Sequence, residues 1–267
     1  RDVERSRGLG DVYKRQLSML SVRGMMVHSA KWTPEMIRIG NIKDIIPLCG
    51  YGVPDEETAL FSNEKYATFI FENELIPYWE KDGSNTYNQL HFYDLPWPTE
   101  VLEQMGEENV KIRITLSYYV KPSPGYAGRS NKYRYPSATL HFDLKSASES
   151  MEEFLCRRNK SEGEKRTDND TNRWTIKQQR REQGTVQSDW IECTAAELAS
   201  CGQIIVYPGQ GWWKERKLAN VDNVIKYSLI VSIETTKTEI YDAVETAISN
   251  SCLLYTSDAA DDLTRVD

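Results

Sequence analysis

The sequence has no long apolar run. No stretch approaches the roughly 20 consecutive apolar residues that a membrane-spanning helix requires, and the amino terminus lacks the charged, apolar and small segments of a secretory signal. Of the 267 residues, 39% are hydrophobic and 27% charged, as in globular proteins rather than disordered or membrane chains. We therefore expect a folded core and no membrane partner.

Cysteine and histidine are scarce, with five and three copies. No Cys-x-x-Cys pair occurs and no histidine lies close to a cysteine, so zinc-ligand spacing is absent. The acidic run at residues 55–57 lacks the spacing of a calcium loop and fits the start of a helix. We expect no metal and no cofactor. Four scattered cysteines outside the carboxyl-terminal tail favour free thiols in a reducing compartment, hence a cytoplasmic location; they are Cys49, Cys156, Cys193 and Cys201.

Basic residues are fewer than acidic ones, with 33 lysines and arginines against 40 aspartates and glutamates. The formal net charge is -7 and the pI is about 5.2, which argues against a general nucleic-acid binder, because such proteins need many lysine and arginine contacts to phosphate. We do not expect nucleic acid as a partner.

Both ends of the chain differ in character from the rest. Residues 1–16 and 252–267 closely resemble translated sequencing-adapter read-through. We therefore interpret them as artefact tails and leave them out of the fold prediction.

Residues 17–62 are predicted to be helical. From Leu20 to Ala30 apolar residues recur at spacings of three and four, which indicates a helix with one buried face. Thr33 and Pro34 then form a helix start, and Gly40 ends that helix. The segment CGYGVPDEETAL predicts a turn followed by a short helix that ends near Leu60.

From Tyr66 onward the pattern changes to short alternating runs separated by turn residues, which predicts a mainly β fold with a β-sandwich at residues 66–250. In VKIRITLSYYV, residues 112, 114, 116 and 118 share an apolar face, and residues 111, 113, 115 and 117 share a polar one. This alternation predicts a half-buried strand. VIKYSLIVSIET repeats the pattern, and further strands are expected at 66–72, 87–93, 137–144 and 203–207.

Two further segments interrupt the strands. Residues 157–187 are dense in charged and amide side chains, with Trp174 and Ile176 as the large apolar anchors, and predict an exposed, mobile insertion. Residues 194–200 predict a short helix, because Thr194 and Glu197 have the spacing of a capping box.

The segments VRGMMVHSAKWTPEMIR and CGYGVPDEETAL resemble the end of the catalytic domain of subtilisin-like serine peptidases, where a helix packs behind the active site and a Gly-Tyr-Gly turn leads to a final helix. Downstream, HFYDLPWPTEVLEQMGEENVKIRITLSYYVKPSPG, YRYPSATLHFDLK, SDWIECTAAELASCGQIIVYPGQGWWKER and YSLIVSIET resemble, in order, the appended β domain of one bacterial branch. The blocks span residues 22–236. The resemblance implies a β-sandwich preceded by the last helices of a subtilase α/β catalytic domain.

The resemblance also implies a function. Catalysis in this family uses Asp, His and Ser in that chain order, with the serine in a Gly-Thr-Ser motif that this sequence lacks. The triad would therefore lie upstream, none of the present residues would be catalytic, and this portion would be inactive within a parent serine endopeptidase. Implied partners are the upstream catalytic domain, a polypeptide substrate and an AAA-type ATPase, beside which relatives of this branch often occur.

The candidate partner or substrate surface combines a loop with a tryptophan pair. Its residues are Tyr126, Arg129, Lys132, Tyr133, Arg134, Trp212 and Trp213. The structural alternative is that the loop only connects two strands and its tyrosines pack on the surface of the sandwich. One tryptophan would then cap the core and the other would be exposed. Two further alternatives remain open: a non-enzymatic binding module for protein or carbohydrate, and nucleic-acid binding through the three basic loop residues.

The histidines are interpreted as structural. His28 and Ser29 are neighbours on a predicted helix, so their side chains point about 100° apart and do not form a nucleophile–base pair. His91 and His141 each precede phenylalanine in a predicted strand. For them we expect cross-strand packing or a buried hydrogen bond.

Overall fold

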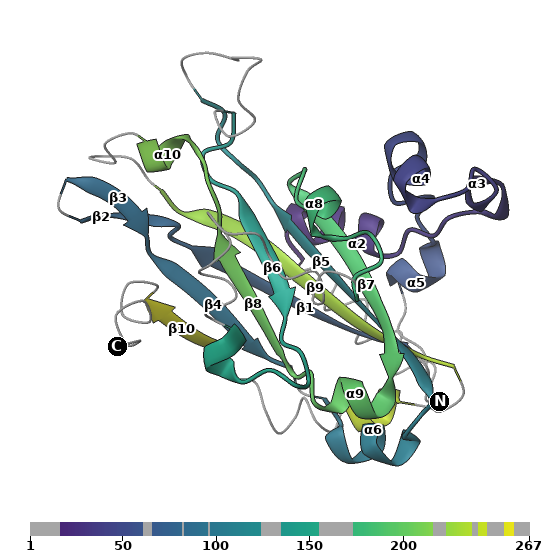
Figure 1. Cartoon of the computed structure of the whole chain (residues 1–267). Coiled ribbons are helices and arrows are strands. Elements are labelled where there is room, and N and C mark those ends of the chain that lie inside the picture. The colour runs from purple at the N-terminus through teal and green to yellow at the C-terminus, as the bar shows by residue number, and fades with distance from the viewer. Residues whose placement is uncertain are drawn as a thin grey trace.

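The computed structural model describes residues 17–60, 66–81, 83–95, 97–123, 135–154, 173–215, 223–236 and 240–244, together with the backbone of 254–258. The fold is mainly β and its strand pairs are antiparallel, as the alternating sequence pattern predicts. Two four-stranded sheets pack against each other, and a separate two-stranded ribbon extends from one end (Figure 1).

Non-sequential strands are neighbours in both sheets. The first sheet has the order β1 (Tyr66–Leu75), β9 (Ile225–Thr235), β5 (Asn109–Tyr118) and β7 (Val186–Thr194). The second has the order β10 (Leu254–Asp258), β4 (Gln89–Asp94), β8 (Gln203–Pro208) and β6 (Leu140–Leu144). The ribbon pairs β2 (Tyr78–Lys81) with β3 (Ser84–Tyr87).

The helices lie before and between the strands. They are α2 (Met19–His28), α3 (Pro34–Ile37), α4 (Ile42–Cys49), α5 (Glu56–Leu60), α6 (Thr99–Met105), α8 (Gln178–Arg181), α9 (Ala195–Ala199) and α10 (Trp212–Glu215). The predicted capping box of α9 is confirmed, because the Thr194 hydroxyl accepts from the Glu197 amide and the Glu197 carboxylate accepts from the Thr194 amide.

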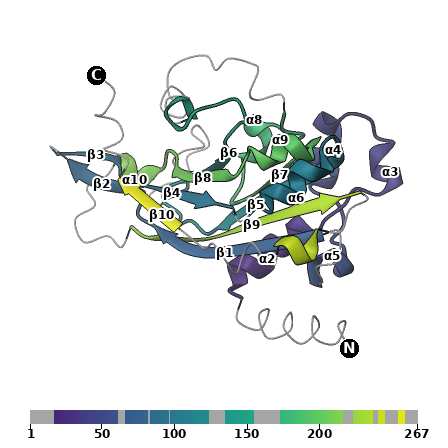
Figure 2. The same cartoon turned by 90° about the horizontal axis from the view of Figure 1, so that it is seen from below.

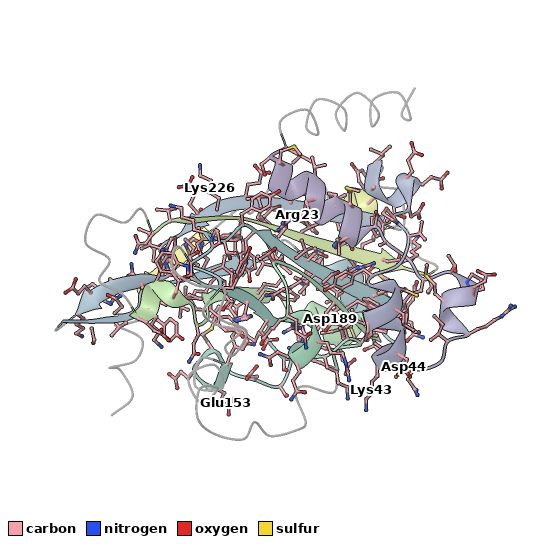
Figure 3. All side chains as sticks on the ribbon, turned by 90° about the horizontal axis from the view of Figure 1, so that it is seen from above. Arg23, Lys43, Asp44, Glu153, Asp189 and Lys226 are labelled. Carbon is pink, nitrogen blue, oxygen red and sulfur yellow. The ribbon has the colours of Figure 1, made fainter. Side chains whose placement is uncertain are left out.

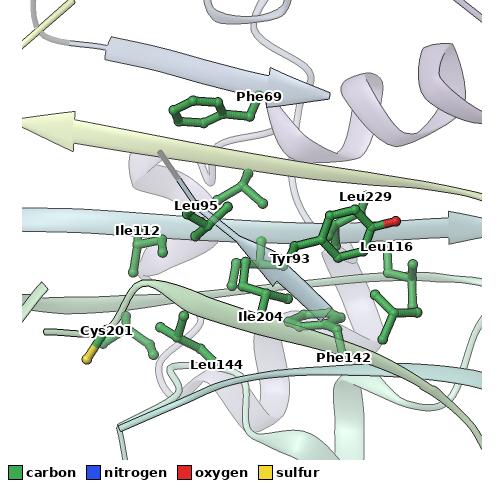
Figure 4. Packing of buried hydrophobic residues seen from close by; sticks show 14 of the residues in the cluster. Phe69, Tyr93, Leu95, Ile112, Leu116, Phe142, Leu144, Cys201, Ile204 and Leu229 are labelled. Carbon is green, nitrogen blue, oxygen red and sulfur yellow. The ribbon is translucent and has the colours of Figure 1, made fainter. Parts of the chain in front are cut away.

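The core lies between the two sheets. Alternate residues of β5 point into it, with Ile112, Ile114 and Leu116 fully buried, and they meet Phe142 of β6 and Ile204 of β8 (Figure 4). The inner faces of β5 and β9 are those that the alternation predicts. Burial of these side chains supplies the main stabilisation, at about 25 cal/mol per Å² of apolar surface.

The outer face of β5 is not exposed, contrary to the half-buried strand expected there. Arg113 is 7% exposed, and Thr115 and Ser117 are 0% exposed. The reason is that α2 lies across this face and forms a third layer (Figure 2). Gly24 permits the close approach, because a Cβ atom there would stand 2.6 Å from Cδ1 of Ile230.

Helix α2 confirms the predicted helix but not its single buried face. Leu20 and Met25 are buried against the sheet, whereas Val22 is 42% and Met26 55% exposed. The apolar residues lie on both sides of the helix, a distribution typical of helices enclosed within a larger structure.

The segment after α2 projects beyond the sheets (Figure 1). Thr33 caps α3 through a hydrogen bond from the Met36 amide, as expected. Helix α4 lies within the region predicted to be helical, but no separate helix was predicted at its residues. Two aromatic side chains connect the segment to β7. The ring centroids of Trp32 and Trp190 lie 5.3 Å apart, and the Tyr51 hydroxyl donates a hydrogen bond to the Val186 carbonyl over 3.4 Å.

The end of the charged insertion packs against the sandwich. Residues 155–172 lie outside the described residues, but from 173 onward Trp174 and Ile176 are buried, and so is Arg181. Three side chains of this stretch donate to alternate carbonyls along the free edge of β6. The pairs are Gln187 with Leu140, Arg181 with Phe142 and Arg173 with Leu144. Residues 173–187 are therefore an edge cover, not a free loop.

Candidate interaction surfaces

The predicted loop residues Tyr126, Arg129, Lys132, Tyr133 and Arg134 lie outside the described residues. The described chain brings the base of this loop together at a bridge between Pro122 and Pro136. Next to it, Tyr135 is 60% exposed. The loop therefore leaves the sandwich beside an exposed aromatic ring.

The tryptophan pair is divided between core and surface. Trp213 is 1% exposed and belongs to the core, so its ring is not available to a partner in this conformation. Trp212 is partly buried, and its indole N–H donates to the Lys121 carbonyl over 3.1 Å. Gly211 makes this packing possible, because a Cβ atom there would lie 2.3 Å from the Ser137 carbonyl oxygen.

Lysines lie over aromatic rings at this end of the molecule. Lys214 Nζ is 3.8 Å from the centroid of Tyr87, and Lys81 Nζ is 5.9 Å from that of Trp79, which is 41% exposed. The Asn85 amide donates to the Trp213 carbonyl over 2.7 Å and holds the β2–β3 ribbon against α10. Such cation–π pairs contribute about 0.5–1 kcal/mol at exposed sites.

A buried polar layer joins α2 to the first sheet. His28 Nδ1 lies 2.8 Å from the Thr115 hydroxyl and Nε2 lies 2.8 Å from the Ser232 hydroxyl. Thr115 donates onward to Ser188, so Nδ1 carries the imidazole proton and Nε2 accepts from Ser232. Burial, together with the Arg113 and Lys111 charges, holds the pKa of His28 well below its usual value. The ring is neutral and bridges two strands.

Arg113 ties the carboxyl end of α2 to the sheet. Its guanidinium donates to the Ala30 carbonyl over 2.7 Å, to the Val27 carbonyl over 3.0 Å and to the Ser188 hydroxyl over 3.1 Å. Burial lowers the pKa of Arg113 to about 10, so the group keeps its charge at neutral pH. The positive charge at the end of a helix is favourably placed with respect to the helix dipole.

The amino half of α2 is held in the same manner. The Ser21 hydroxyl donates to the Glu72 carboxylate and lies 2.7 Å from the Ser228 hydroxyl. Arg23, labelled in Figure 3, donates to the Tyr118 carbonyl over 2.6 Å, and its guanidinium lies over the Tyr119 ring. Burial alone would raise the pKa of Glu72, but hydrogen bonds from the Ser18 and Ser21 side chains lower it overall. Polar groups thus fix α2 along its length.

The opposite side of the helical segment is an apolar surface, which we call the outer helical surface. Figure 3 labels Lys43 and Asp44 on α4, which belongs to this segment. The members of the outer helical surface are exposed by 41–72%: Met19, Val22, Met26, Ile37, Ile39, Leu48, Val53 and Leu60. Large exposed apolar side chains gathered on one segment are a feature of interaction sites.

The other candidate residues have structural roles. His91 is 2% exposed and its Nδ1 lies 2.6 Å from the Tyr227 hydroxyl, which confirms the expected buried hydrogen bond. His141 lies 3.6 Å from Glu182. Asp55 accepts from Lys31 and Thr58 at the start of α5. Among the described residues, no cluster of three or more His, Cys, Asp and Glu side chains has the arrangement of a metal site.

The described cysteines, Cys49, Cys193 and Cys201, are free. Burial raises the pKa of Cys193 to about 12 and also raises that of Cys201. These two thiols therefore remain protonated and are poor nucleophiles at neutral pH.

The polar layer under α2 had a signal in the sequence. Ser and Thr occupy the central outer positions of β5 and β9, at Thr115, Ser117, Ser228 and Ser232. Small hydroxyl side chains suit a covered sheet face, because they leave room for a helix and can still form hydrogen bonds. Helix α2 was predicted as a helix, but the side that faces the sheet had no comparable signal, because apolar residues lie on both sides of it.

Within the described residues, no helix has the length and apolar content needed to cross a bilayer. Comparison with known proteins found no matching family model, no matching curated protein and no matching solved structure.

Proposed function

We propose that this chain is the non-catalytic carboxyl-terminal portion of a subtilisin-like serine endopeptidase. In this proposal residues 17–62 pack against the catalytic α/β domain of the same polypeptide, and the β-sandwich stabilises that domain and positions a polypeptide substrate or a partner. An AAA-type ATPase partner follows from the resemblance, and a cytoplasmic location follows from the scattered cysteines; both are parts of the same proposal.

One observation carries the proposal: the distribution of polarity around α2. The side that contacts the sheet is rich in polar groups, among them Ser21, Arg23 and His28, whereas Met19, Val22 and Met26 face outward. A surface helix normally has the reverse arrangement. A further protein layer over the outer helical surface would enclose α2 on both sides, and the resemblance assigns the catalytic domain to that layer.

The described residues also support the view that this portion is inactive by itself. His28 contacts the Ser232 hydroxyl, but the ring is buried, both of its nitrogens bond to hydroxyl groups, and its pKa lies well below the usual range. A triad histidine needs a carboxylate on one nitrogen and a nucleophile on the other. The sequence also lacks the Gly-Thr-Ser motif.

The test is to obtain the genomic sequence upstream of Leu17 and express the longer chain. We expect an Asp, a His and a Gly-Thr-Ser in order, serine-directed fluorophosphonate labelling of the longer chain, and no labelling of the present one. Replacement of Val22 and Met26 by lysine should abolish soluble, active product of the longer chain. Gln104→Lys, at an exposed site on α6, is the control that adds a lysine elsewhere and should leave activity intact. An upstream sequence without the three motifs contradicts the proposal.

A non-enzymatic binding module is the second candidate, and the exposed aromatic side chains favour it. Trp79, Tyr119 and Tyr135 are 41–60% exposed, and lysines lie over neighbouring rings. Aromatic side chains contribute strongly to recognition surfaces. Binding of a protein or carbohydrate by the present chain, lost on Trp79→Ala and unaffected by the lysine substitutions in α2, would favour this function.

A further inference from the structure

The two edges of the second sheet are closed in different ways. At the β6 edge, the carbonyls of Leu140, Phe142 and Leu144 already accept from side chains. These donors belong to a segment that is anchored in the core by Trp174 and Ile176. An added strand would have to displace all three donors, so this edge is protected against strand pairing.

The β4 edge is covered by the backbone of one short strand. β10 pairs antiparallel with β4, from Leu254 opposite Tyr93 to Asp258 opposite Gln89. Among the described strands, β10 is hydrogen-bonded to β4 and to no other, because it is the outermost strand of its sheet. Its attachment therefore depends on one set of ladder hydrogen bonds.

Strand β4 is held by side-chain hydrogen bonds that do not involve β10. The His91 ring and the Tyr93 hydroxyl both contact the hydroxyl of Tyr227, at 2.6 and 2.5 Å, and the Gln203 amide donates to Asp94 over 2.9 Å. His91 and Tyr93 are 2% and 3% exposed. When β10 detaches, the hydrogen-bonding edge of β4 is left preorganised, and preorganisation reduces the entropy cost of binding.

β10 is paired on one side alone, and edge elements of this kind open locally without global unfolding. Each of its ladder hydrogen bonds contributes about 0.5–1.5 kcal/mol. The pairing uses backbone groups, so another extended segment can replace β10. This argument holds whether or not residues 252–267 belong to the natural chain.

We infer that the edge of β4, residues Gln89–Asp94, is a binding site for an extended polypeptide, which adds antiparallel to the second sheet after β10 has left. This binding mode is β-strand addition. The ligand is an extended segment of about five residues without proline, with an apolar side chain at the position that faces the part-buried Phe92. The inference does not depend on the peptidase assignment.

The experiment compares the full chain with a variant whose β10 cannot pair. Tyr255→Pro together with Thr256→Pro removes two adjacent amide N–H groups, one of which must face β4, since successive groups alternate in direction. The probe is a fluorescein-labelled peptide with the sequence of residues 253–259. Fluorescence anisotropy should show binding to the variant at least about tenfold tighter than to the unchanged chain, in which β10 occupies the site. The same peptide with both central residues replaced by proline should bind to neither.

Absence of binding to the folded variant would overturn the inference, and so would equal binding of the proline-containing peptide. Circular dichroism and thermal unfolding establish that the variant is folded. If it is not, hydrogen exchange of the unchanged chain decides the question. Excess unlabelled peptide should then accelerate exchange at residues 254–258, and unaltered exchange would contradict the inference.

Discussion

At the scale of single residues, the buried histidines make stability depend on pH. The folded-state pKa of His91 is about 4 and that of His28 lies well below 6.5, because burial disfavours the charged rings. In the unfolded chain both titrate near the ordinary value of about 6.5. Their contribution is therefore complete above about pH 6.5 and is lost as the pH falls from there toward the folded-state values.

The first prediction concerns this window. Between about pH 6.5 and 5, each buried histidine should lower the free energy of unfolding by up to about 1.4 kcal/mol per pH unit. Urea unfolding across this range measures the slope. His28→Gln should make the slope shallower, and replacement of Asp44, an exposed carboxylate on α4, should not. A slope that is the same in the His28 variant and the parent chain would contradict the assignment.

The second prediction concerns Arg113. Arg113→Met leaves the Val27 and Ala30 carbonyls without this donor and should lower the free energy of unfolding by about 2–4 kcal/mol. Lys226→Met is the control: it removes an exposed lysine from the neighbouring strand β9, and a loss of at most about 1 kcal/mol is expected there. Urea unfolding measures both variants. An equal loss of unfolding free energy in the two would show that the hydrogen bonds from Arg113 add no stability beyond that of an exposed lysine.

At the scale of secondary-structure elements, strand alternation predicted the inner faces of β5 and β9 correctly, because period-2 patterning follows directly from backbone geometry. It failed for the outer face of β5. Whether Thr115 and Ser117 face water or a helix depends on α2, which lies far away in the sequence. The ribbon β2–β3, strand β7 and helix α4 were missed, since short elements have weak local signals.

The candidate site was predictable only in part. The sequence identified the Trp212–Trp213 pair, but burial of Trp213 depends on its close packing after Gly211, which no local pattern indicates. The burial of Arg181 could not be predicted either, because a run of charged residues usually lies on the solvated surface. Its guanidinium instead lies 4.4 Å from the ring centroids of both Phe142 and Trp174.

The third prediction follows from that contact. Arg181→Ala should expose the β6 edge and leave Asp189, with which Arg181 forms a buried ion pair over 3.7 Å, without its counter-charge. Loss of such a partner costs about 3–5 kcal/mol. Thermal unfolding with light scattering should show a lower midpoint and earlier aggregation. The neighbouring Arg180→Ala, at a more exposed site, is the control.

At the scale of the whole molecule, α2 covers part of one face of the first sheet as a third layer. Among the described residues, its side chains Met19, Val22 and Met26 are exposed. The fourth prediction is that Met19, Val22 and Met26 replaced together by lysine will increase the solubility of the present chain and lower its tendency to associate, measured by static light scattering. Unchanged association would show that this surface does not mediate it.

The protected β6 edge also limits the form of any assembly built through the second sheet. Strand pairing that began at β4 of one molecule would have no complementary opening at β6 of the next, because that side is already occupied by arginine and glutamine donors. Such growth ends after a single pairing event, so the products are closed pairs rather than continuous fibrils.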